Sequence, residues 1–390
     1  MSKINAATFL KDHQERAFSD EREFLNFLED RALADEWAVM PTEFVEVQGL
    51  ENCPIGAQSI ADSIEGYEGT VDGLTETMGE FGFVVSYYDA TEQRKRSFPI
   101  REFAVSSLFE RAGLNGRILR EQGENSLPAA KKAEWLSTAL KHWAGMECKL
   151  LLRDGKVSTC RTQKYIPLDT VSLVKRTYEA LPEEAHFESA SVSHEMTQCE
   201  IVFGSEEGDN DIRYELSKIG VTCQDVKRFV RFYTSDTGDA AATLIPYISV
   251  DGCDMPLGSP YKMVHSRGAS VEKWEALIGN VSSIFNDTLA KLKELCGIKL
   301  RNPASVLRYG ACEIGLPKAT SLKFAKEWEE TLAGAETTAY DMYRKLIELI
   351  GNIEAGGKVS LAGKLHIREN VSRFLNMNLA SLDFKFEWDQ

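Results

Sequence analysis

The sequence predicts an α+β protein, with a mixed, mainly antiparallel sheet, packed helices and a helical C-terminal lobe. In residues 229–250 an aromatic and β-branched run, a short polar turn with Gly238 and a second apolar run follow one another. This order is typical of two antiparallel strands joined by a tight turn. Asp154-Gly155, the dipeptide preferred in type I′ turns, indicates another hairpin. From Ser270 onward, apolar residues recur three and four positions apart, as on one face of a helix.

The first of three predicted parts, residues 1–78, is expected to be helical or irregular. Residues 5–34 carry apolar side chains at roughly helical spacing, with Asp20 placed as an N-cap. Residues 44–47 alternate as in a short strand.

The second part, residues 79–268, is predicted to be the α+β body. It opens with a hairpin of residues 81–88 and 96–100. Pro99 places the return strand at a sheet edge, because proline cannot donate a ladder hydrogen bond. The acidic run 205–211 is expected to be a solvated loop. The other elements expected here are helices over 101–114, 129–143 and 169–181, and strands over 187–192 and 196–203.

The third part, residues 269–390, is predicted to be a helical lobe. Ser270 is a suitable N-cap for a helix that ends near Gly297. Further helices are expected over 321–332, 338–350 and 365–375. A chain of 390 residues exceeds what one compact core usually holds, which agrees with two or three lobes.

The composition is acidic, because 45 Lys and Arg stand against 60 Asp and Glu and give a net charge of −15. Such a surface repels nucleic acid and acidic membranes, so a contact with DNA or RNA needs a local basic patch. There is no apolar run of membrane-spanning length, and residues 1–10 lack the apolar core of a secretory signal. The eight cysteines include no Cys-x-x-Cys pair, which predicts reduced thiols and a cytoplasmic protein without a membrane partner.

Positive charge is concentrated in residues 94–120, which carry a net charge of +5 and leave −20 for the rest of the chain. Such a patch suits a phosphate backbone, with neighbouring aromatic residues to stack on unpaired bases. The same charges also fit a solvated hairpin tip, a helix face or the protected edge of a strand. The candidate nucleic-acid-binding residues are Arg94, Lys95, Arg96, Arg101, Arg117, Arg120, Arg153, Lys156, Lys227, Arg228 and Arg231.

Three passages carry short motifs: residues 98–114, residues 151–169 and residues 234–238. They resemble a family found in phages, plasmids and prophages, the domain-of-unknown-function family numbered 932. The chain departs from the family pattern at Thr234, and in the polar loop expected around Cys253, where the family often has Cys-x-Asn-Gly. The resemblance implies a mobile-element accessory protein and no known reaction. The matching positions of interest are Tyr165, Ser235, Asp236, Gly238, His265 and Gly268.

Ser235, Asp236 and His265 also suggest a hydrolase or nuclease, because they are the residue types of a nucleophilic triad. Adjacent Ser and Asp side chains diverge on a strand, however, and no Gly-x-Ser-x-Gly turn surrounds them. A turn cap bonded to its own backbone explains them better, so no catalytic residue is assigned. His265 and Cys253 alone are too few ligands for a metal. The absence of P-loop and Gly-x-Gly-x-x-Gly motifs likewise predicts no cofactor.

The leading functional hypothesis is a non-enzymatic phage or mobile-element protein, homo-oligomeric, that binds or anneals single-stranded nucleic acid. The general layout of annealing recombinases offers a fold-level analogy. A second hypothesis is an anti-defence inhibitor whose acidic surface occupies a basic host protein. The third is a hydrolase that uses Asp236 and His265.

Overall fold

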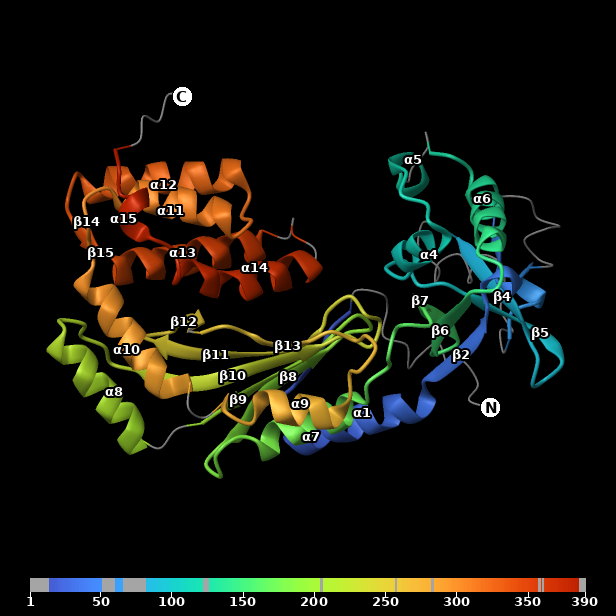
Figure 1. Cartoon of the computed structure of the whole chain (residues 1–390), viewed down its shortest axis with the longest axis horizontal. Helices are drawn as coiled ribbons and strands as arrows, with labels where there is room; N and C mark the ends of the chain where they lie inside the picture. The colour runs from blue at the N-terminus through green and yellow to red at the C-terminus, as the bar shows by residue number, and fades with distance from the viewer. Residues whose placement is uncertain are drawn as a thin grey trace.

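The computed structural model describes residues 14–385, apart from 51–59, 66–81, 122–125, 204–205, 257, 282–283, 357–358 and 360. These residues form an α+β protein with antiparallel strand ladders, as the sequence predicts. Two bodies are visible in Figure 1. The larger contains a seven-stranded sheet between helices, and the smaller contains two three-stranded sheets with helices α4, α5 and α6.

The large sheet has the strand order β1-β8-β9-β10-β11-β12, and β13 also pairs with β11. Its strands are β1 (Arg16–Phe18), β8 (His186–Val192), β9 (Thr197–Val202), β10 (Val226–Thr234), β11 (Ala242–Val250), β12 (Cys253–Pro256) and β13 (Tyr261–Met263). Pro246 lies in the buried strand β11. On one side, the partners of β11 change from β13 at Leu244 to β12 at Tyr247. Pro246 therefore occupies the gap between two partner strands, where a missing N–H does no harm.

Helices cover both faces of the large sheet (Figure 1). One face carries α1 (Glu21–Ala34), α7 (Thr170–Glu179) and α9 (Val271–Ile278). Over the other lie α11 (Pro303–Glu313), α12 (Lys318–Leu332), α13 (Ala339–Ala355), α14 (Leu361–Phe374) and α15 (Leu379–Leu382). Helices α8 (Glu206–Lys218) and α10 (Ile284–Gly297) lie at the end of the sheet opposite the smaller body. A continuous apolar core joins the sheet to helices of both layers.

The smaller body has its own apolar core. One sheet consists of β2 (Glu36–Pro41), β6 (Glu147–Arg153) and β7 (Lys156–Thr162), the other of β3 (Glu46–Gly49), β4 (Phe83–Asp89) and β5 (Arg94–Pro99). Helices α4 (Val105–Ala112), α5 (Arg117–Arg120) and α6 (Ala129–His142) belong to it, together with the short helix η1 (Thr42–Phe44). The N-terminal segment thus supplies β1 and α1 to the larger body and β2 and β3 to the smaller.

Several local predictions are confirmed. Asp154 and Gly155 have φ values of 52° and 69°, the left-handed backbone that a type I′ turn requires. β5, which ends in Pro99, is an edge strand. Asp20 and Ser270 cap α1 and α9 by accepting hydrogen bonds from the backbone N–H groups of the third helical residues.

Four local predictions are wrong. Residues 5–34 are not one helical stretch, because Arg16–Phe18 form strand β1 and α1 begins at Glu21. The acidic run is not a loop, because α8 begins at Glu206. Negative charge is favourable at a helix start, and Ile212 and Leu216, four residues apart, supply a buried apolar face. The expected loop at Cys253 is strand β12, which pairs with β11. The helix expected from residue 101 begins at Val105, because the backbone N–H of Arg101 is bonded to Val157 of β7.

Candidate functional site

The basic hairpin that the sequence singles out is electrostatically neutralised. Arg94 bonds to Glu92 at 2.6 Å and to Glu65 at 3.2 Å, and Lys95 bonds to Glu46 at 2.6 Å. Arg96 is buried and contacts the carboxylates of Glu36, Glu65 and Asp89. Three cations therefore meet five carboxylates, and three of these, those of Glu36, Glu46 and Glu65, lie outside the hairpin. The hairpin does not present the net positive charge that a phosphate backbone requires.

The cations of β10 are paired in the same way. Lys227 lies 3.1 Å from Glu188 and Glu200, Arg228 lies 2.9 Å from Asp209, and Arg231 lies 2.8 Å from Glu200. Arg101 is fully buried and contacts Asp154 at 3.2 Å. Of the remaining candidates, Arg120 is exposed and Lys156 is half-buried, whereas the side chain of Arg117 lies outside the described residues.

A mostly buried cluster of five side chains lies where the two bodies meet. We call Arg31, Asp35, Arg153, Thr170 and Asp236 the Asp236 cluster. Asp236 follows β10, and its Oδ2 accepts hydrogen bonds from Arg31 of α1 at 2.8 Å and Arg153 of β6 at 2.9 Å. Its Oδ1 accepts one from the Thr170 hydroxyl, at the start of α7, at 2.5 Å. Arg153 also holds Asp35 in a bidentate pair at 2.8 and 2.5 Å. The cluster thus ties together four elements with balanced charge.

Burial alone raises the pKa of Asp236, but the charges of Arg31 and Arg153 and the hydrogen bond from Thr170 outweigh it and lower that pKa to about 2. The Arg31 guanidinium is less favoured: burial and the repulsion of Arg153 lower its pKa to about 10. The pKa of Arg153 is raised, because two carboxylates offset its burial. Asp236 is therefore held as an anion by two buried cations, which is the electrostatics of a structural ion pair.

Acidification is expected to weaken the fold through Asp236. Its pKa lies below the ordinary 3.8, so its contribution is complete above about pH 4 and is lost as the pH falls through about 2. The shift corresponds to about 2 kcal/mol of unfolding free energy. Urea unfolding of the wild type and of Asp236→Asn between pH 5 and pH 2 measures this. The variant should lose less stability on acidification, and equal losses would contradict the assignment.

Most of the positions that carry the family resemblance lie close together around Tyr165. The Tyr165 hydroxyl donates to the backbone carbonyl of Asp236 at 2.8 Å, and its ring stacks on His265 at 5.4 Å. Gly238 has a φ of 81°, and a Cβ there would lie 2.8 Å from the Tyr165 ring, so glycine is needed on both counts. Gly268 also has a left-handed φ, of 88°, but a Cβ there would meet no atom within 4 Å.

The described side chains do not assemble a nucleophilic triad. The Ser235 hydroxyl donates to the carbonyl of Glu195 at 2.6 Å, and both carboxylate oxygens of Asp236 are already occupied. Nε2 of His265 lies 3.1 Å from the buried Thr234 hydroxyl, and Nδ1 lies 3.3 Å from the Tyr165 hydroxyl. Burial lowers the pKa of His265. These contacts define a rigid polar turn, as the turn-cap interpretation expects.

A search of the described residues for metal ligands finds no group of three or more His, Cys, Asp or Glu side chains that could hold an ion. Among the same residues, no helix is long and apolar enough to cross a membrane.

Sequence reasoning missed Arg31, Asp35 and Thr170. Thr170 alone had a signal in the sequence, because Asp169 before it is a typical N-cap and fixes the start of α7.

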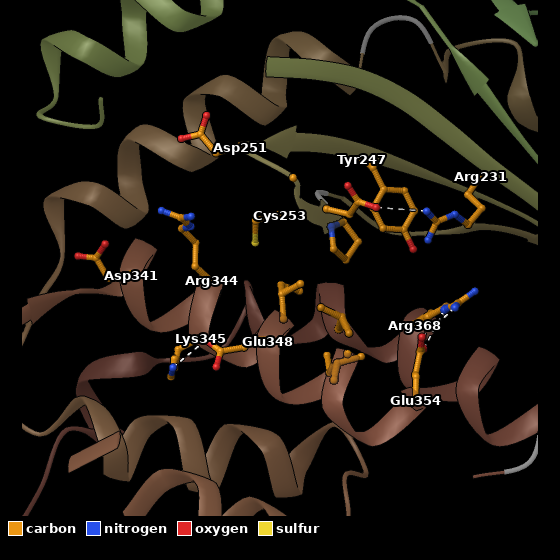
Figure 2. A pocket seen from close by; sticks show the side chains of 17 residues that line it. Arg231, Tyr247, Asp251, Cys253, Asp341, Arg344, Lys345, Glu348, Glu354 and Arg368 are labelled. Carbon is orange, nitrogen blue, oxygen red and sulfur yellow. Dashed lines mark hydrogen bonds and ion pairs between the residues drawn. The ribbon is translucent and has the colours of Figure 1, made fainter. Parts of the chain in front are cut away.

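Sequence reasoning also missed a cleft between the large sheet and helices α13 and α14, with a volume of about 640 Å³ (Figure 2). Arg231 is the one predicted site residue in its wall, and the other lining cations come from the C-terminal helices.

Comparison with known proteins yields no match: no family model, no curated protein and no solved structure is similar to this chain. By its fold and site, the chain is an α+β protein of two bodies that are joined by an ion-pair cluster.

Proposed function

We propose that this chain is a non-enzymatic binding protein of a phage or mobile element, which occupies the basic, nucleic-acid-binding surface of a host protein. The mobile-element origin rests on the resemblance described above. The kind of partner follows from charge, because an acidic protein is attracted to a basic surface and competes there with nucleic acid.

One observation supports this proposal over direct binding of single-stranded nucleic acid. Eight of the eleven cations that the sequence singled out form ion pairs with carboxylates of the same chain. Cations paired internally release few counterions on contact with phosphates, so they add little to nucleic-acid affinity. These positions therefore form no local basic patch that could overcome the repulsion between nucleic acid and a chain with a net charge of −15.

A competition experiment tests the proposal. Host proteins are loaded on single-stranded DNA cellulose at low salt, and the purified chain is added in increasing amounts. We expect the chain to release a small set of basic proteins and to co-elute with them in size-exclusion chromatography. The co-elution should vanish near 0.5 M salt, where charges are screened within about 5 Å.

Fluorescence anisotropy with a labelled 40-nucleotide strand is the second arm of the experiment. Direct binding at micromolar protein and low salt would overturn the proposal in favour of nucleic-acid binding. Release of no host protein at low salt, or co-elution that 0.5 M salt leaves unchanged, would overturn it as well.

A further inference from the structure

The cleft between the large sheet and the C-terminal helices has the size of a small-molecule site. Its volume of about 640 Å³ lies within the range of about 300–1,000 Å³ usual for ligand pockets. The sheet side is formed by β10, β11 and the turn into β12, and the helix side by α13 and α14 (Figure 2). Apolar atoms of Pro256, Ile347, Ile350 and Val371 line part of the wall.

Three of the four cations in the wall are paired with carboxylates. Arg231 bonds to Glu200 at 2.8 Å and lies over the Tyr247 ring at 4.8 Å. Arg368 holds Glu354 through two nitrogens, at 2.9 and 2.8 Å. Lys345 bonds to Glu348 at 2.7 Å. These pairs leave little unopposed charge at the right-hand and lower sides of the cleft in Figure 2.

Arg344 is the exception among the lining cations. It is half-buried and projects from α13 into the cleft below Asp251 (Figure 2). Among the described residues it forms no ion pair within 4 Å; its nearest neighbours in the cleft include the Cys253 thiol, and its guanidinium lies 6.0 Å from the centre of the Tyr340 ring. A thiol is a weak acceptor, so most donors of this guanidinium are left for another partner. Guanidinium groups bind phosphate and carboxylate through paired hydrogen bonds.

We propose that the cleft binds a small organic anion, with one phosphate or carboxylate head on Arg344 and an apolar or planar body against Ile347 and Ile350. The acidic wall limits the charge of the ligand. Four lining cations stand against five carboxylates, those of Asp251, Asp254, Asp341, Glu348 and Glu354. A polyanion such as a nucleoside triphosphate or a nucleic-acid strand is repelled there, whereas a single head is accepted. This site is independent of the function proposed above.

Isothermal titration of the full chain with four probes tests the site: adenosine monophosphate, benzoate, adenosine triphosphate and inorganic phosphate. We expect a Kd below about 1 mM for the monophosphate or for benzoate, and weaker binding of the triphosphate and of inorganic phosphate. Arg344→Gln should weaken binding at least about tenfold, the usual effect of losing a charge-assisted hydrogen bond. Arg301→Gln, at a side chain that is 83% exposed and outside the cleft, is the matched control and should bind normally.

Alkylation of Cys253 gives a readout that needs no variant. Cys253 lines the cleft and is half-buried, while Cys296 and Cys312 are equally half-buried but lie outside it. The bound probe should slow iodoacetamide labelling of Cys253 several-fold and leave the other two unchanged, as measured by mass spectrometry. The proposal is overturned by unprotected Cys253 at probe concentrations up to 10 mM, by wild-type affinity in Arg344→Gln, or by a triphosphate or inorganic phosphate that binds as tightly as the other probes.

Discussion

Replacing Asp236 by alanine is expected to lower the free energy of unfolding by about 3–5 kcal/mol, the usual effect of removing one partner from a buried ion pair. The substitution leaves Arg31 and Arg153 buried with Asp35 as their remaining carboxylate. It also removes the acceptor of the Thr170 hydroxyl. Urea denaturation followed by circular dichroism measures the change.

Glu29→Ala is the control, because this carboxylate of α1 is 48% exposed and pairs at 2.9 Å with Lys175 of α7, which is 50% exposed. An exposed pair contributes at most about 1 kcal/mol, so the control should stay close to the wild type. A second substitution sharpens the test: in Asp236→Ala with Arg31→Leu, the bidentate pair of Asp35 and Arg153 stands alone with balanced charge. We expect this double variant to regain about 1–2 kcal/mol over Asp236→Ala. If it regains nothing, unpaired charge is not the cause.

The Asp236 cluster also shows which features of the site the sequence can predict and which it cannot. The turn after β10 was recognisable, because short polar residues and a glycine between two apolar runs are a local signal. The partners of Asp236 were not, because Arg31 and Arg153 are 205 and 83 residues away in the sequence. Only the antiparallel sheets, which bring the ends of α1, β6 and β10 together, turn three distant charges into one site.

The prediction of a nucleic-acid-binding patch at the basic hairpin failed because its ion-pair partners are also distant in the sequence. Its cations stand close together in the sequence, so their summed charge is visible there. The carboxylates that neutralise Arg96 arrive from β2 and β4 and from residue 65, and none of these pairings can be read from spacing. Local charge density along a chain therefore indicates a binding patch only after the neighbouring strands have been placed.

Helix faces were easier to predict than the depth at which each residue is buried. Trp274 and Trp135 each belong to a run of apolar residues at helical spacing, a pattern that predicts an inward-facing position for both. Trp274 is fully buried, but Trp135 on α6 is 40% exposed. A helix packed against a single sheet buries only the central stripe of its apolar face, so a tryptophan at the margin stays partly in solvent.

The different burial of Trp274 and Trp135 leads to a second prediction about the free energy of unfolding. Trp274→Ala should lower the free energy of unfolding by about 3–5 kcal/mol, the usual range for a large aromatic residue deleted from a core. The indole packs edge-on against Phe232 of β10 at 5.6 Å, and its Nε1 donates to the Thr177 hydroxyl of α7 at 3.0 Å. One side chain thus joins α9, α7 and the sheet. Its removal leaves a cavity and takes one donor from the Thr177 hydroxyl, which still donates to the Leu173 carbonyl at 2.8 Å.

Trp135→Ala removes the same side chain from a half-solvated position, where less area leaves water on folding and no enclosed cavity results. We expect a loss of about 1–2 kcal/mol, again by urea denaturation followed by circular dichroism, since both variants lose an indole fluorophore. Equal losses in the two variants would mean that α9 does not hold its place through Trp274. A loss confined to Trp274→Ala would show that the helix after residue 270 is part of the core of the large sheet, because its anchor lies between β10 and α7.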